Sequence, residues 1–278
     1  MQSKAQKNKG GALTYIYMTL CVVVALFPIL WVMMSSFKTN AEILSDGISL
    51  PTSFRFDGYA MALRISPIMR FFYNSIIITG ISTFLNVFLI AMAGYVFART
   101  SFRGKNQIYW LLATSLVIPA TSLLHPVYLV VSALGLADNI VGLILVYTAL
   151  NLPMTLLIMR STFLTLPASL EEAAYIDGAG FGYAYFRVML PCAKSGLSSA
   201  AVLAFLNSWN EFTFALVLTK SEAVRTLPLS LSYFTSQFSF NYTALFAAVT
   251  MAVLPSIAVF AVFQEQVSSS LVMGAVKG

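Results

Sequence analysis

A short segment near residue 170 concentrates acidic and small residues in a chain that has only ten Asp and Glu. Ser169 stands three positions before Glu172, the spacing of a capping box, and this predicts a helix that starts directly after Ser169. Glu171 and Glu172 then lie in the first helical turn, where carboxylates interact favourably with the helix dipole. Asp177-Gly178 is expected to end this helix, because glycine adopts backbone conformations that other residues avoid.

A second short helix is predicted from about Ala179 until Pro191, which should stop it. This stretch is strongly apolar, and Arg187 is its only charged residue. The apolar surface of such a helix has to be covered by another surface. The residues alone leave three covers open: the membrane surface, the rest of the chain, or a partner protein.

A second candidate group contains the carboxylate of Glu211 and the amides of Asn207 and Asn210, within the apolar run 195–219. A carboxylate inside a membrane-spanning helix is by default a functional hypothesis. These side chains can offer hydrogen-bond acceptors to the hydroxyls of a polar solute that crosses the membrane. The alternatives are a hydrogen bond that packs helices together, or a side chain that reaches the outer interface.

Other kinds of chemistry find little support. His125 is the only histidine, which disfavours a Ser–His hydrolase and a histidine-rich metal site. Cys21 and Cys192 cannot build a disulfide framework or a zinc site of their own. The glycines of 178–182 are not followed by Gly-Lys-Ser/Thr, so they do not form a phosphate-binding loop. We therefore expect neither a metal nor bound ATP in this chain.

The elements that position these groups must be transmembrane helices. Of 278 residues 59% are hydrophobic and only 9% are charged, whereas soluble domains are about 25% charged. This composition excludes a soluble globular domain, a disordered chain and a nucleic-acid-binding protein, in spite of the net charge of +6. The apolar runs are continuous rather than alternating, which indicates helices rather than a barrel.

The predicted fold class is an all-α integral membrane protein with six transmembrane helices, built as a single domain over residues 1–278. A spanning helix needs roughly 20 apolar residues. The runs of that kind lie at about 13–36, 71–98, 108–131, 140–159, 196–219 and 243–263. The remaining parts are an N-terminal tail at 1–12, a long inner loop at 160–195 and a C-terminal tail at 264–278.

The basic residues predict the orientation. With both termini inside, ten of the sixteen Lys and Arg lie in cytoplasmic segments, as expected of inner loops. Arg99, Arg103 and Lys105 form a tight basic loop beside one span end. The N-in, C-in arrangement accounts for the net charge without an acidic substrate.

The inner loop resembles the EAA loop of ABC-importer permeases. The resemblance rests on Glu172-Ala173-Ala174, Gly178, Val188 and Leu190-Pro191 at the family spacing. In that family the loop is a coupling helix that docks in a cleft of the cytoplasmic ATPase. The resemblance therefore implies that an ATPase covers this helix. The residues to which it assigns ATPase coupling are Glu171, Glu172, Ala173, Ala174, Asp177, Gly178, Phe181, Leu190 and Pro191.

Further motifs along nearly the whole chain are similar to carbohydrate-importer permeases of the maltose-permease-G type. They include Asn74-Ser75, Ile118-Pro119, Trp209-Asn210-Glu211-Phe212, Thr226-Leu227-Pro228 and Gly274-Ala-Val-Lys-Gly278. Ser195 departs from the pattern, since many relatives carry a second proline there.

This resemblance implies a multi-pass protein of the cell membrane that imports a sugar or oligosaccharide. Its implied partners are a second permease subunit, an ATPase homodimer that binds the ATP and Mg, an extracytoplasmic sugar-binding protein and the lipid bilayer. In such relatives the C-terminal tail reaches the ATPase dimer, which gives Gly274, Lys277 and Gly278 this expected role. The permease itself is expected to be non-catalytic.

One rival from another class is an ion-coupled secondary transporter of small polar solutes. Such coupling usually needs several ionisable groups near the midplane of the bilayer. The predicted spans hold Glu211 and little else, which argues against it. The identity of the solute cannot be read from this chain alone.

Overall fold

The structure is a computed structural model that describes residues 4–234 and 241–275. Within these ranges all regular structure is helical, as the continuous apolar runs predict. The chain divides into two compact units. The first comprises Met1–Ile68 and Leu231–Val253, and the second comprises Met69–Ser230 and Leu254–Gly278.

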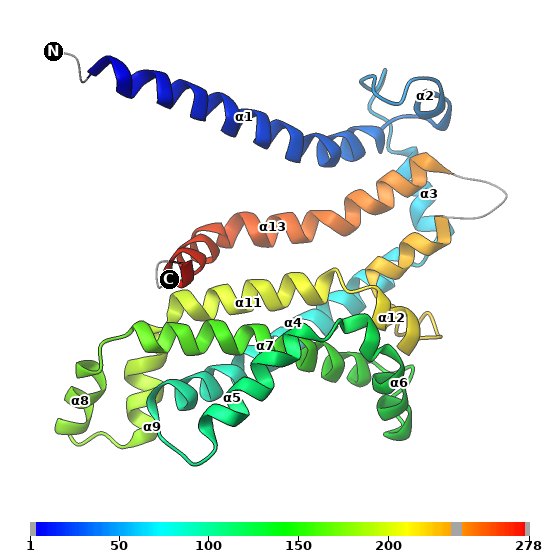
Figure 1. Cartoon of the computed structure of the whole chain (residues 1–278). Helices are drawn as coiled ribbons and strands as arrows, with labels where there is room; N and C mark the ends of the chain where they lie inside the picture. The colour runs from blue at the N-terminus through cyan, green and yellow to red at the C-terminus, as the bar shows by residue number, and fades with distance from the viewer. Residues whose placement is uncertain (1–3, 235–240, 276–278) are drawn as a thin grey trace. The chain divides into compact units, whose positions relative to one another are not determined.

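The first unit contains α1 (Lys4–Ser35), α2 (Asn40–Ser45), α3 (Asp57–Ile65), the last residues of η4 (Leu227–Phe234) and the first part of α13 (Tyr242–Ala275). Figure 1 labels α1, α2, α3 and α13. A capping box fixes the start of α2: Glu42 N donates to Thr39 Oγ1, and Thr39 N donates to Glu42 Oε2 at 2.7 Å. The helix α3 packs closely on α13, since a Cβ on Gly58 would lie 2.7 Å from Thr243 Cγ2.

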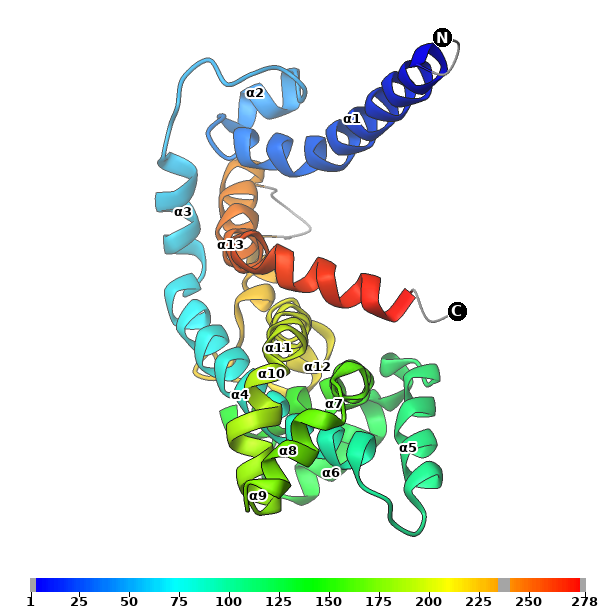
Figure 2. The same cartoon turned by 90° about the vertical axis from the view of Figure 1, so that its left-hand side faces the viewer.

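The second unit contains the predicted inner loop and most of the predicted spans. Its helices are α4 (Ile68–Arg99), α5 (Lys105–Thr114), η1 (Ser115–Val117), η2 (Ala120–Leu123), α6 (Leu124–Ala133), α7 (Ile140–Thr165), α8 (Ser169–Ile176), α9 (Phe181–Tyr183), η3 (Ala184–Met189), α10 (Leu190–Cys192), α11 (Lys194–Trp209), α12 (Thr213–Leu218), η4 (Leu227–Phe234) and the rest of α13. The helices α7 and α11 lie side by side, and both are seen nearly end-on in Figure 2. The helices α8 and α9 lie at one end of this pair, whereas α6 and α12 lie at the other (Figure 1).

Two apolar clusters fill this second unit. One surrounds Tyr147 and joins α4, α6, α7 and α12, with Ile78, Val131 and Phe214 among its buried members. The other joins α4, α7, η3 and α11 around Tyr95. The second cluster lies at the end that carries α8 and α9, so the segment after α8 is packed onto the helices rather than free in solution.

Four described helices are long and apolar enough to cross a membrane, and the number rises to six if each of two bent helix pairs is one span. The four are α4, α7 and the segments Leu13–Ser35 and Tyr242–Gln264 of α1 and α13. The bent pairs are Lys105–Val117 with Ala120–Ala133 and Phe181–Cys192 with Lys194–Trp209. A multi-pass helical membrane protein is therefore confirmed.

The third predicted span, 108–131, is not a continuous helix. It bends by 103° between Lys105–Val117 and Ala120–Ala133. Pro119 has no N–H for the helical ladder and forces the preceding residue out of the helical region. Ile118 is accordingly extended, at φ −76° and ψ 119°.

The fifth predicted span, 196–219, is also interrupted. The helix α11 ends at Trp209, and α12 begins at Thr213. Glu211 therefore lies in a break between two helices rather than inside one. Several helices also extend past the predicted span ends, because a helix ends where its backbone is capped and not where the hydrocarbon does. Thus α1 begins at Lys4, and α13 continues to Ala275.

Candidate functional site

The acidic segment forms the helix α8, but it is not capped as predicted. The helix starts at Ser169 itself, and Ala168 occupies the N-cap position without any side-chain hydrogen bond. The predicted capping box of Ser169 and Glu172 is therefore wrong. Ser169 already has helical geometry, and the backbone N–H of Glu172 donates to the Ala168 carbonyl at 3.1 Å. A helical bond has taken the place that the serine hydroxyl would have filled.

The predicted turn after α8 forms at the predicted residues. Asp177 is the C-cap of α8, and Gly178 follows with a φ of +80°. The Gly178 N–H donates to the Tyr175 carbonyl at 3.0 Å. A Cβ at Gly178 would meet nothing within 4 Å, so the left-handed backbone alone favours glycine here.

The second helix begins at Phe181 and does not stop at Pro191. It runs as α9, a π-helical turn (η3) and α10, and it ends at Cys192. The expected stop at Pro191 is one residue too early, because Leu190–Cys192 continue the helix that begins at Phe181. A bend of 75° then leads into α11.

The nine predicted coupling residues differ in exposure. Six are exposed, and they lie in α8, in the turn after it and near the two ends of the second helix: Glu172, Ala173, Asp177, Gly178, Phe181 and Pro191. Ala174 is buried, and Glu171 and Leu190 are half-buried. Large apolar side chains are exposed beside them. We define the tip surface as Tyr175, Ile176, Phe181, Tyr183 and Phe186, of which Ile176 is 86% exposed.

Glu171 points back into its own chain. Tyr95 Oη donates to Glu171 Oε1 at 2.5 Å, and Tyr175 Oη donates to the same oxygen at 3.1 Å. Arg99 Nε lies 3.8 Å from Glu171 Oε2, and an Arg99 Nη group also donates to the Leu166 carbonyl. Two residues one turn apart on α4 thus hold α8 and the chain that leads into it.

An aromatic cluster backs this contact. The Tyr95 ring lies 5.0 Å from Tyr185, 5.4 Å from Phe163 and 5.4 Å from Phe181, between ring centroids. These rings come from α4, α7, α9 and η3. Aromatic pairs at such distances contribute about 0.5–1.5 kcal/mol beyond the burial of their surface. The second helix is consequently covered on one face by its own chain, although Phe181, which belongs to this cluster, remains 50% exposed.

The Glu211 carboxylate joins the start of α12, after the break in the fifth span, to the helix α7. Phe214 N donates to its Oε1 at 2.7 Å, and Ala215 N donates to its Oε2 at 3.0 Å. Tyr147 Oη, from α7, donates to Oε2 at 3.0 Å. The carboxylate therefore satisfies the free N–H groups at the start of α12, as a capping side chain does. These contacts favour the packing alternative for Glu211.

The two asparagines are placed differently. Asn207, in the last turns of α11, and Asn210, its C-cap residue, are both exposed. Asn207 Nδ2 donates to Asn151 Oδ1 at 3.1 Å, and Asn151 in turn donates to Ser208 Oγ at 3.0 Å. Asn210 Nδ2 donates locally, to the Leu206 carbonyl in the last turn of α11, at 2.8 Å. Both amides keep polar atoms on the surface of an apolar helix.

Sequence reasoning missed four residues that hold these groups in place: Tyr95, Arg99, Tyr147 and Asn151. Arg99 stood out only as a basic residue near a span end. Tyr147 and Asn151 lie four positions apart within an apolar run, and this spacing places both on one face of α7. A polar pair on one face of a spanning helix was the signal that could have found them.

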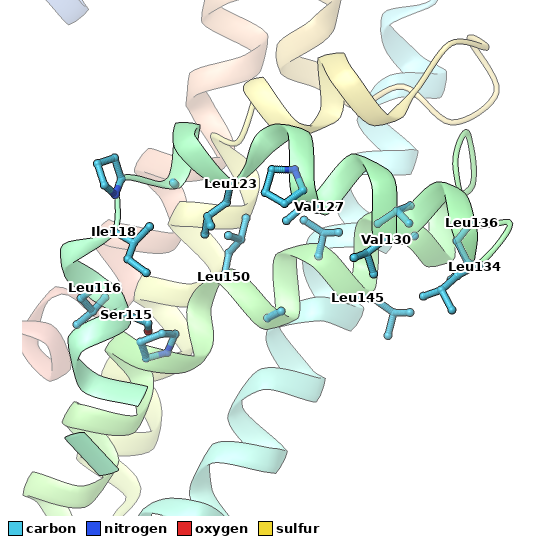
Figure 3. A pocket seen from close by; sticks show the side chains of 18 residues that line it. Ser115, Leu116, Ile118, Leu123, Val127, Val130, Leu134, Leu136, Leu145 and Leu150 are labelled. Atoms are coloured by element: carbon cyan, nitrogen blue, oxygen red, sulfur yellow. The ribbon is translucent and has the colours of Figure 1, made fainter. Parts of the chain in front are cut away.

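A groove of about 720 Å³ lies between α6, α7 and the bend at Pro119 (Figure 3). Its walls are aliphatic apart from Ser115, with Leu116, Val130 and Leu145 among the lining residues. A solute rich in hydroxyl groups would lose its water there without gaining hydrogen bonds. This groove is therefore unsuited to a polar solute.

The predicted C-terminal contact with the ATPase involves three residues of the tail. Gly274 lies within α13, and Lys277 and Gly278 lie outside the described residues.

Comparison with known proteins gives concordant results. The model of the family described as "Binding-protein-dependent transport system inner membrane component" matches residues 58–272. The diacetylchitobiose uptake system permease protein NgcG of Streptomyces coelicolor is 37% identical over 96% of this chain and 89% of its own length. The trehalose transport system permease protein SugB of Mycobacterium tuberculosis is 36% identical, over 94% of this chain and 95% of its own.

The fold also matches a solved structure. A chain from the crystal structure of a bacterial ABC transporter involved in the import of the acidic polysaccharide alginate superimposes with a TM-score of 0.80. It covers 94% of this chain and 97% of its own length, at 24% sequence identity. At that identity the likeness concerns the fold alone.

Proposed function

This chain belongs to the family of binding-protein-dependent transport system inner membrane components, and we propose that it is the permease subunit of an ATP-driven importer for a sugar or oligosaccharide. The observation that carries the substrate class is the near full-length similarity to two permeases whose names specify diacetylchitobiose and trehalose. Both are oligosaccharides. The chain is a multi-pass component of the cell membrane.

The partners in this proposal are a second permease, two copies of a cytoplasmic ATPase and an extracytoplasmic sugar-binding protein. The exposed tip surface supports an ATPase contact, because large apolar side chains flank the exposed carboxylates of Glu172 and Asp177. Interfaces of this kind bury an apolar centre within a polar rim. The ATPase holds the ATP and Mg, and this chain contributes no catalytic residue.

Transport then proceeds by alternating access. ATP binding closes the ATPase dimer, and the tip surface moves with it. Because the second helix packs on Tyr95 and Phe163, this movement reaches α4 and α7. The cavity between the two permeases opens outward to receive the sugar from the binding protein, and it opens inward after hydrolysis. Gly274, Lys277 and Gly278 contribute a further contact with the ATPase.

Asn207 and Asn210 line the path in this proposal. An exposed amide on an apolar helix is costly in lipid but stable in a hydrated cavity, where it can also bond a sugar hydroxyl. Glu211 supports the path indirectly, since it holds α12 in place after the break. The ion-coupled alternative would need a carboxylate free to exchange protons, whereas both oxygens of Glu211 accept hydrogen bonds.

Purification tests the proposal. The tagged chain, extracted from its native membrane in mild detergent, is expected to bring with it a second permease and an ATPase. The ATPase activity of the complex should rise when the sugar-loaded binding protein is added. A chain that purifies alone and transports solute in that state contradicts the proposal and favours an ion-coupled transporter.

A further inference from the structure

Glu171 and Glu172 are neighbours in α8, yet their carboxylates face opposite environments. Glu172 is exposed on the outer side of the helix. The Glu171 side chain is only 14% exposed, and the side chain of its partner Arg99 is 13% exposed. Two adjacent acidic residues thus have different tasks: one can reach a partner protein, and the other is occupied within the chain.

The side chain of Glu171 contacts the helix α4. Tyr95 and Arg99, both on the last turns of α4, engage the two oxygens of the Glu171 carboxylate. Arg99 also donates to the carbonyl of Leu166, the C-cap residue directly after α7. The guanidinium therefore joins the ends of α4 and α7 to the first turn of α8. We call Tyr95, Arg99 and Glu171 the clamp.

The charged side chains of the clamp are largely shielded from water, so their contact can hold α8 to α4 when α8 moves. A charge pair that is mostly removed from water interacts more strongly than an exposed pair, and the loss of one partner leaves the other uncompensated. The aromatic contacts of Tyr95 with Tyr185 and Phe181 hold the second helix, whereas α8 reaches α4 through Glu171. Loss of the carboxylate would release α8 from α4 and leave the second helix packed.

We propose that Glu171 is a positioning residue that transmits the movement of α8 to α4 through Tyr95 and Arg99, rather than a residue that binds the ATPase. This inference rests on the proposed function, since it presumes that an ATPase moves α8. It assigns the two glutamates separate roles: Glu172 belongs to the docking surface, and Glu171 couples that surface to a membrane-spanning helix.

The test uses the whole importer, with both permeases, the ATPase and the binding protein, in sealed vesicles. Three quantities are measured for each variant: the ATPase that co-purifies, the rate of ATP hydrolysis and the sugar imported per ATP. Glu171→Gln is expected to retain the ATPase and its hydrolysis but to import at least about fivefold less sugar per ATP, the lower end of typical couplings between sites. Glu172→Gln is expected to lower the amount of co-purified ATPase instead.

Two further variants sharpen the result. Ser169→Ala is the matched control, because its exposed side chain lies in α8 and makes no cap. It should match the wild type in all three measurements. Tyr95→Phe removes one hydroxyl from the clamp and keeps the ring, so it serves if Glu171→Gln does not assemble. Like Glu171→Gln, it should import less sugar per ATP than the wild type, with the ATPase still bound.

The inference is overturned if Glu171→Gln and Tyr95→Phe import as much sugar per ATP as the wild type. It is equally overturned if Glu171→Gln loses the ATPase as Glu172→Gln does, because Glu171 would then be a docking residue. Failure of the proposed function looks different: the wild-type complex itself would show no ATP-driven sugar import.

Discussion

Thr162 on α7 and Gly196 on α11 face each other so closely that a Cβ on Gly196 would lie 2.7 Å from the Thr162 Cβ. Gly196→Ala would therefore push α7 and α11 apart, and overpacking of this kind costs about 1–3 kcal/mol. We expect a lower melting temperature for the detergent-solubilised protein. Gly80→Ala is the matched control, since a Cβ there meets nothing within 4 Å. Equal melting of the Gly196→Ala and Gly80→Ala proteins would show that the contact has no such role.

The turn at Gly178 allows a test that separates backbone conformation from side-chain contact. Its φ of +80° is unfavourable for a β-branched residue, by about 1–2 kcal/mol. We expect Gly178→Val to remain in the membrane but to reduce the amount of ATPase that co-purifies. Gly178→Asn should be milder, because asparagine tolerates this region.

Gly180→Ala is the control for this turn. Gly180 has an ordinary φ of −78°, and a Cβ there meets nothing within 4 Å. If Gly180→Ala and Gly178→Val reduce the co-purified ATPase equally, the left-handed turn is not what positions the tip surface.

The bonds of Glu211 predict an order among three variants. Glu211→Ala removes both N–H contacts of α12 and the bond from Tyr147, and the loss of a cap costs about 0.5–2 kcal/mol. Glu211→Gln retains one carbonyl acceptor, and Tyr147→Phe removes a single bond, worth about 0.6 kcal/mol in a membrane protein. Thermal unfolding should rank Glu211→Ala as the least stable. Unchanged stability of Glu211→Ala together with lost transport would instead favour a role in the path.

Asn210 offers the cleaner test of the proposed path. Because its amide is exposed and donates to its own helix, Asn210→Ala should leave assembly and ATP hydrolysis unchanged. We expect sugar import to fall several-fold, as for the loss of a hydrogen bond worth about 0.5–1.5 kcal/mol. Asn207→Ala also loses the contact with Asn151, so it should lower stability as well. Normal import by Asn210→Ala would remove this residue from the path.

Asp138, outside the membrane-spanning segments, predicts a pH dependence. Its Oδ1 accepts the backbone N–H groups of Ser221 and Lys220 at 2.9 and 2.8 Å, and these bonds hold the pKa of the carboxyl below its usual range. A lowered folded pKa stabilises the protein above the unfolded value of about 3.9, and this contribution disappears as the pH falls through the folded pKa.

Asp138→Asn should therefore melt earlier than the wild type at pH 7, and the difference should shrink below about pH 4. Asparagine keeps an acceptor and tolerates the φ of 55° at this position, so the backbone is matched. A difference that stays constant with pH would show that the charge of Asp138 does not contribute.

The helical membrane fold could be predicted from the sequence, because helices and closed barrels are the only backbone structures that span lipid. Continuous apolar runs without charges indicate helices, and the structure confirms a helical, multi-pass protein. The breaks were harder to foresee. Pro28 and Pro153 remain inside α1 and α7, whereas Pro119 separates two helices by 103°. Proline permits each of these outcomes, and tertiary packing decides between them.

In the candidate site too, features set by neighbouring residues could be predicted, whereas contacts between distant residues could not. The turn at Asp177-Gly178 forms as predicted, because glycine at a helix end is a local signal. The partners of Glu171 and Glu211 could not be inferred locally, since Tyr95 lies 76 positions from Glu171 and Tyr147 lies 64 positions from Glu211. The capping box at Ser169 failed because the helix began one residue earlier than the motif requires.

The most direct test of the proposed function is sugar uptake by sealed vesicles that contain the complete complex, with the sugar-loaded binding protein outside. ATP enclosed in the vesicles, without any ion gradient, should drive accumulation of the sugar, and a non-hydrolysable ATP analogue should not. Accumulation that needs a proton or sodium gradient and proceeds without ATP would contradict the account.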